Sequence, residues 1–210
     1  MKKAVLVLLL FVCFIGFVEA SPYYYKSLIS IGVGPGLETV ISDDTGGNIS
    51  NITIGMYICN QFKENSKTCL FADLQCEIPM KLSSGNYKIT RSDLDPNIWM
   101  NAGIIMGPAW KKSYSNAPLE SIIGIGIAVK EDLLAVSTTY GSVGSMELSF
   151  GLGLSVAFNY TISDYLSVLF NLSQQYGLLN WVYNGDSFEL TEGFRLSTTA
   201  RIGFGLTLMP

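Results

Sequence analysis

Histidine is absent from all 210 residues of the chain. Its absence removes the commonest general base, the Ser–His and Cys–His nucleophile pairs, and most zinc sites. Charged residues are also scarce, at 14% against about 25% in a typical soluble domain. No basic cluster is present, so the electrostatic signature of nucleic-acid binding is missing. These absences argue against an enzyme and against a nucleic-acid partner.

A long apolar run is also missing from the chain after its first 20 residues. No segment there approaches the roughly 20 consecutive apolar residues that a transmembrane helix requires. Hydrophobic residues nevertheless make up 49% of the sequence, and 21 residues are glycine. A chain that is apolar overall, poor in charge and rich in glycine, yet without such a run, is typical of a membrane β-barrel.

Residues 1–20 have the pattern of a secretory signal peptide. Two lysines precede an apolar segment, and Ala20 ends a small-x-Ala cleavage pattern. An uncleaved anchor helix and lipidation at Cys13 are alternatives, but the apolar segment is short and Cys13 follows a valine rather than a small residue. We therefore expect residues 1–20 to be a cleaved signal peptide and residues 21–210 to form the exported domain.

Two segments alternate between apolar side chains and polar or small ones. In 146–160 the apolar row begins at Met146, and in 194–208 it begins at Phe194. A period of two indicates a β-strand with one apolar face. Weaker alternation places six further strands, so eight are expected in all, at 28–40, 51–60, 68–78, 98–108, 120–129, 146–160, 166–176 and 194–208.

Eight such strands predict an all-β, eight-stranded antiparallel up-and-down transmembrane β-barrel. Closure pairs the first strand with the last and removes edges whose backbone groups lipid could not satisfy. Counted from a periplasmic N-terminus, the extracellular links are expected at 41–50, 79–97, 130–145 and 177–193. They are mostly longer than the opposite links at 61–67, 109–119 and 161–165, and this asymmetry is typical of outer-membrane barrels.

Aromatic residues gather near the expected strand ends, where the two membrane interfaces would lie. These residues are Tyr23, Tyr24, Tyr25, Trp99, Trp110, Tyr114, Tyr160, Tyr165, Tyr176 and Trp181. The alternative is that they belong to an ordinary soluble β-core.

In these features the chain resembles the small eight-stranded outer-membrane proteins of the OmpX, OmpW and OmpA-barrel kind. The segment 194–208 is similar to the C-terminal signal that the outer-membrane insertion machinery reads, although the chain ends in Pro210 where the family usually ends in Phe. The resemblance implies an outer-membrane location and contact with the lipid bilayer and lipopolysaccharide-type lipids. It also implies the insertion machinery as a partner, with an extracellular ligand bound through the loops.

Six charged residues fall on the inner row of the expected barrel: Glu38, Asp73, Glu77, Glu147, Arg195 and Arg201. Charges in a narrow lumen need partners because their desolvation is costly, so a paired polar plug is expected, with a gated pore as the alternative. Glu38 and Arg195 lie near the outer ends of the first and last strands. They are expected to pair, unless the register separates them or Glu147 takes the arginine instead.

The exported domain holds three cysteines. Cys59 and Cys69 flank the first short turn on the inner row, and a disulfide between them is chemically allowed after export, although their spacing does not establish it. Cys76 falls on the outer row and is expected to act as a small apolar residue. Without a CxxC pair or a histidine, no metal or other cofactor is expected.

The leading hypothesis is a bacterial outer-membrane β-barrel protein, structural or surface-exposed, that acts through its loops and is not an enzyme. A small, porin-like transport channel for apolar or small solutes is the alternative. A soluble, lipocalin-like secreted barrel is the third reading. It would cover its exterior with charge, whereas the polar row here is mostly Gly, Ser, Thr and Asn.

Overall fold

The computed structural model describes residues 26–41, 46–64, 66–94, 96, 98–138, 141–183 and 187–208. The expected signal peptide lies outside these residues. Within them, no helix is both long enough and apolar enough to cross a bilayer. The elements are β1 (Lys26–Ile41), β2 (Gly46–Gln61), β3 (Thr68–Ser84), β4 (Tyr87–Thr90), α2 (Arg91–Leu94), β5 (Ile98–Ser113), β6 (Leu119–Thr138), β7 (Gly141–Thr161), β8 (Leu166–Tyr183), β9 (Phe188–Thr191) and β10 (Phe194–Leu208).

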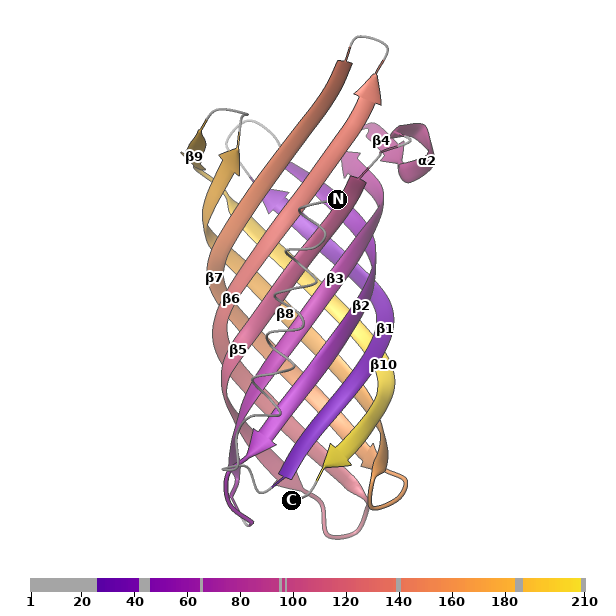
Figure 1. The fold of residues 1–210 in the computed structure, drawn as a ribbon, viewed down its shortest axis with the longest axis vertical. Coiled ribbons are helices and arrows are strands. Elements are labelled where there is room, and N and C mark those ends of the chain that lie inside the picture. Colours follow the sequence, from indigo (N-terminus) through magenta and orange to yellow (C-terminus); the bar gives the residue numbers. More distant parts are fainter. Residues whose placement is uncertain are drawn as a thin grey trace.

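Eight long antiparallel strands form a closed barrel, as the alternation predicts (Figure 1). They pair in the order β1-β2-β3-β5-β6-β7-β8-β10, and β10 returns to β1 from Ser27↔Leu208 to Ile41↔Phe194. The short strands β4 and β9 fold back on β3 and β8. We call the end that carries β4, α2, β9, the end of β6 and the start of β7 the upper rim, and the opposite end the lower end (Figure 1).

The two faces of each strand separate apolar from polar side chains. On β10, Ile202 and Phe204 are 60% and 71% exposed on the outside, whereas Arg201, which directly precedes Ile202, is 3% exposed. The glycines of the inner row make room for large side chains from other walls. A Cβ on Gly55 would collide with the Arg201 guanidinium, and a Cβ on Gly124 would collide with the Phe71 ring. The lumen is therefore filled by side chains, as expected for eight strands.

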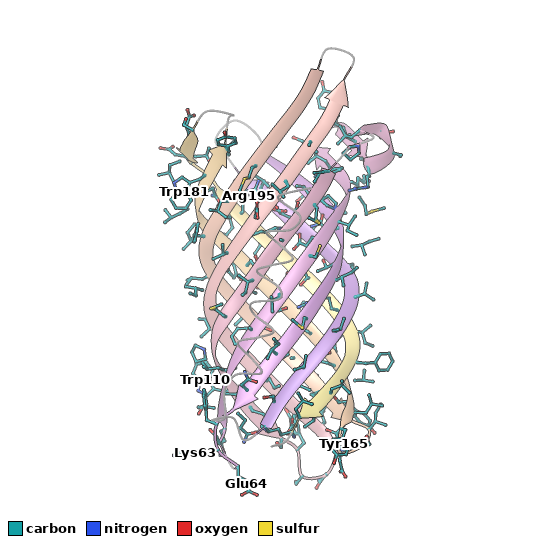
Figure 2. All side chains as sticks on the ribbon, viewed as in Figure 1. Lys63, Glu64, Trp110, Tyr165, Trp181 and Arg195 are labelled. Carbon is teal, nitrogen blue, oxygen red and sulfur yellow. The ribbon has the colours of Figure 1, made fainter. Side chains whose placement is uncertain are left out.

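Most of the described aromatic residues near the strand ends face outward. Trp110 and Tyr165 are exposed at the lower end, and Trp181 packs edge-on against Phe150 near the upper rim, with ring centroids 5.3 Å apart (Figure 2). Trp99 is the exception, because it lies on the inner row of β5 and is buried. The expectation of an interfacial position is therefore wrong for Trp99.

The strands β3 and β8 continue beyond their expected ends. The alternation does not reveal this continuation, because a β-bulge in each strand reverses it. The pairing of β2 with β3 skips Met80, next to Pro79, and the pairing of β7 with β8 skips Leu178, next to Gly177. A bulge adds one residue to one strand, so the inner row changes parity beyond it. The expected ends at Ile78 and Tyr176 are the points where the simple alternation stops.

The expected loop at 130–145 is wrong. The strand β6 continues to Thr138 and β7 begins at Gly141, so the segment is a long hairpin that rises above the other strands (Figure 1). This segment contains Lys130 and Asp132, which continue the inner row of β6 into the lumen. The expected loops at 79–97 and 177–193 likewise contain β4, α2 and β9.

Candidate functional site

The interior of the barrel holds the chemistry-bearing side chains and is the candidate site. Toward the lower end it is filled by buried apolar side chains, which we call the apolar plug. Within the plug, the rings of Tyr57 and Phe71 stack at a centroid distance of 6.1 Å. The plug consists of Leu28, Tyr57, Cys59, Cys69, Phe71, Ile105, Ala109, Ile122, Ala128, Ala157 and Leu169.

Next to the plug, one buried ion pair crosses the lumen. Arg201 on β10 contacts Asp73 on β3, and its second partner is Asn171, whose Oδ1 lies 2.5 Å from Arg201 Nη2. Gln75 Nε2 also donates to Asp73 Oδ2 at 3.2 Å. Each charge thus has an opposite charge and a neutral hydrogen-bond partner, which offsets the cost of burying both.

Nearer the upper rim, Lys130 bridges two buried carboxylates. Its Nζ lies 2.8 Å from Glu38 Oε2 and 2.9 Å from Glu77 Oε2. Asn51 donates to Glu77 Oε2 at 2.6 Å, and Ser197 donates to Glu77 Oε1 at 3.1 Å. Asn101 on β5 also donates to Glu38 Oε2 at 3.2 Å. Side chains from six strands therefore meet on one ammonium group and its two carboxylates.

Arg195 extends this cluster toward the rim (Figure 2). Its Nη1 lies 3.0 Å from Glu38 Oε1 and also contacts Asp132, while its Nη2 lies 2.5 Å from Glu147 Oε2. The two alternatives that the sequence left open are therefore both realised, since Glu38 and Glu147 share the guanidinium. We call Glu38, Glu77, Lys130, Asp132, Glu147 and Arg195 the upper network.

The structure places all six expected lumen charges inside the barrel but divides them between two clusters. Asp73 and Arg201 form the pair beside the plug, and the other four belong to the upper network. Sequence reasoning missed Lys130 and Asp132. The signal was available, because continuing the period of two past Ala128 puts both residues on the inner row.

The two thiols of the inner row lie side by side. Cys59 Sγ is 2.9 Å from Cys69 Sγ, and both are free thiols in this structure. Cys76 is half-buried on the outer row of β3. Among the described residues, no group of three or more cysteine, aspartate or glutamate side chains is arranged to hold a metal ion.

The lower mouth is closed by polar side chains. Lys111 Nζ lies 3.3 Å from Glu120 Oε1 and 2.7 Å from Gln61 Oε1. The Gln61 amide also donates to three carbonyl oxygens of the β2–β3 turn, those of Lys63, Glu64 and Ser66. This end of the barrel therefore has its own small hydrogen-bonded cap.

The described residues line two small cavities inside the barrel and one larger pocket at its upper mouth. Two cavities, one beside Lys130 and one beside Arg201, have volumes of about 10 Å³, room for about one water molecule. The mouth holds a pocket of about 160 Å³ whose charged lining residues are Arg195, Glu147 and Asp132. Its walls are mostly apolar and come from Ile49, Leu82, Leu94, Trp99, Leu133 and Leu134.

No protein-family model and no curated protein sequence matches the chain. Solved structures do match. The outer membrane protein OprG from Pseudomonas aeruginosa has a TM-score of 0.53 at 9% identity, over 90% of this chain and 98% of OprG. The chain has the fold of the small outer-membrane β-barrels.

Two further solved structures match the chain. The outer membrane protein AlkL, determined in lipid bilayers, has a TM-score of 0.53 at 11% identity, over 91% of this chain and 93% of AlkL. Neisserial surface protein A has a TM-score of 0.49 at 11% identity, over 86% of this chain and 96% of that protein. At identities of 9% and 11%, the likeness to OprG and AlkL shows the fold alone and says nothing about the side chains inside the lumen.

Proposed function

We propose that the protein is a bacterial outer-membrane protein whose closed barrel is a rigid support for a surface-exposed upper rim, without catalysis. Residues 1–20 direct export and are removed, and the outer-membrane insertion machinery folds the rest into the bilayer. The apolar outer row supports this location, since side chains such as Ile127, Ile202 and Phe204 would otherwise face water. The outer end of that surface would contact lipopolysaccharide-type lipids.

The observation that carries this proposal is the contrast between a filled lumen and a structured rim. The apolar plug and the two ionic clusters fill the interior, whereas the β6–β7 hairpin projects above the barrel (Figure 1). A filled interior suits a support better than a pore. A projecting hairpin suits the binding of an extracellular ligand, because binding residues concentrate on connections that a rigid scaffold positions.

The rim next to this hairpin is also held in place. Arg91 of α2 donates to the carbonyl oxygens of Trp99 at 2.8 Å and Pro79 at 3.3 Å, so the helix is tied to β5 and β3. Hydrogen bonds from the Thr90 hydroxyl and backbone N–H keep the pKa of the Asp93 carboxyl below its ordinary value. The rim therefore presents a defined surface and a fixed negative charge.

Epitope insertion tests the location and the orientation together. One variant carries the epitope between Thr138, the last residue of β6, and Gly141, the first residue of β7. The matched control carries it at 162–165, between β7 and β8. Antibody should label intact cells of the first variant only, and both variants after the outer membrane is permeabilised. Labelling of the control alone would invert the orientation. Labelling of neither variant, with both proteins in the soluble fraction, would contradict a membrane location.

A channel for small or apolar solutes is the second candidate, and the apolar walls of the mouth pocket favour it. A solute in this pocket would meet Arg195, Glu147 and Asp132, which all belong to the upper network. We expect no steady conductance from the folded protein in planar bilayers. A steady single-channel current that disappears on heat unfolding would favour the channel over the support.

A further inference from the structure

Cys59 and Cys69 occupy a place in the sheet that suits a cross-link between strands. In the register of β2 and β3, Cys59 lies opposite Phe71 and Cys69 lies opposite Gln61, so the thiols are diagonal neighbours on one face. That face is the inner one, and the Sγ atoms lie 2.9 Å apart. The pair joins the two strands just before the short turn that connects them.

Both thiols are shut away from solvent in the closed barrel. Cys59 is 5% exposed and Cys69 is 4% exposed. Both belong to the apolar plug, with the stacked Tyr57 and Phe71 rings, while Lys111 and Gln61 occupy the mouth at the same end. Thiol–disulfide exchange requires the attacking sulfur to reach a sulfur of the oxidant, so this burial blocks the reaction in the folded barrel.

We propose that Cys59 and Cys69 form a disulfide, and that it forms in the exported chain before the barrel closes. The two residues are ten positions apart, so the unfolded chain closes this loop at a small entropic cost. After closure the same burial protects the bond from reductants. The proposal rests on the proposed function only in requiring export to an oxidising compartment.

The chemistry needs a disulfide-bearing oxidant, such as a thiol oxidoreductase of that compartment. One cysteine thiolate attacks a sulfur of the oxidant, which forms a mixed disulfide and releases the other oxidant sulfur as a thiolate. The second cysteine thiolate then attacks the mixed disulfide at the protein sulfur and displaces the oxidant. The two protein thiols lose two electrons and two protons, and the oxidant disulfide is reduced to two thiols.

Thiol counting by mass spectrometry tests whether the bond exists. Protein purified from the outer membrane is unfolded and alkylated with iodoacetamide, with and without prior reduction. Reduction should add two labels in the wild type and in the matched control Cys76→Ser, and none in Cys59→Ser. The difference of two holds whether or not residues 1–20 remain attached. A wild-type protein that gains no label on reduction would overturn the disulfide.

Oxidation of purified protein tests the order of events and does not depend on where the protein resides in the cell. Reduced protein is either held unfolded in urea or folded into detergent micelles, and each sample then receives oxidised glutathione. The unfolded chain should acquire the disulfide at least roughly a hundredfold faster, because access to the thiols limits the folded form. Similar rates would overturn formation before closure. Failure of the epitope test with the disulfide present would reject the proposed function alone.

Discussion

The two halves of the lumen are built by the same eight strands but filled by opposite means. The apolar plug near the lower end fits by shape, with large side chains set against glycines such as Gly124. The upper network fits by charge, and its four carboxylates share Lys130 and Arg195. The plug gains from every apolar contact, whereas each group in the network depends on a particular partner. A substitution in the plug should therefore lower the free energy of unfolding in proportion to the apolar contacts it removes. A substitution in the upper network should also affect the partners of the substituted residue.

The largest effect is expected for Lys130→Met, which removes the centre of the upper network. Among the described residues, Lys130 is the only cation within salt-bridge distance of Glu77. Breaking a buried pair on one side costs about 3–5 kcal/mol, so the free energy of unfolding in urea, measured in lipid vesicles, should fall by that much. Adding Glu77→Gln should restore part of the loss, because the unpaired charge is then removed. A loss below about 1 kcal/mol would show that the network is solvated.

In the plug, Ile105→Ala should lower the free energy of unfolding by about 2–5 kcal/mol through lost contacts and the cavity left behind. Ile105 is fully buried against Gly153. The matched control is Ile127→Ala, the same change on the outer row, where lipid can fill the space. The effect of Ile105→Ala should not depend on salt, and no second substitution of a charged residue should restore it. Equal losses for the two variants would contradict the assignment of the faces.

The junction between Glu38 and Arg195 should show coupling. In a double-mutant cycle of Glu38→Gln and Arg195→Gln, we expect an interaction free energy of about 0.5–3 kcal/mol, as for residues in direct contact. The control cycle combines Glu38→Gln with Arg201→Gln, whose guanidinium belongs to the Asp73 pair. That cycle should be additive within about 0.5 kcal/mol. Strict additivity in the first cycle would rule the pair out.

The smallest effect is expected at the lower mouth, where Lys111 and Glu120 form a pair with side chains 14% and 16% exposed, whereas Glu38 in the upper network is fully buried. A pair in which both partners keep some contact with water contributes less, about 0.2–1 kcal/mol when it is well solvated. A double-mutant cycle of Lys111→Met and Glu120→Gln should therefore give a small coupling that salt weakens further, unlike the coupling of Glu38 with Arg195. A larger, salt-independent coupling here would remove the distinction between the two ends of the lumen.

Much of the fold and part of the site could be predicted from alternation alone. The period of two assigned Ile202 to the outside and Arg201 to the inside, and it placed the last strand at 194–208, where β10 lies. It failed where the chain changes parity at a bulge, beside Pro79 and Gly177, because a single inserted residue looks like the end of a strand. The alternation does continue through Lys130 and Asp132. These two residues were nevertheless missed, since consecutive charges are more often exposed than paired in a core.

Along the regular strands, the sequence by itself determined which side of the barrel a side chain faces, because pleating sends successive residues to opposite faces. Beyond the two bulges, the tertiary structure decided this as well. Only the tertiary structure decided which inner side chains meet. Height along the barrel depends on the stagger between strands, and closure brings together residues far apart in the sequence. Arg195 on β10 contacts Glu38, Asp132 and Glu147, which come from β1, β6 and β7. Alternation carries no information about that stagger, so the partners of each charge could not be read from the chain alone.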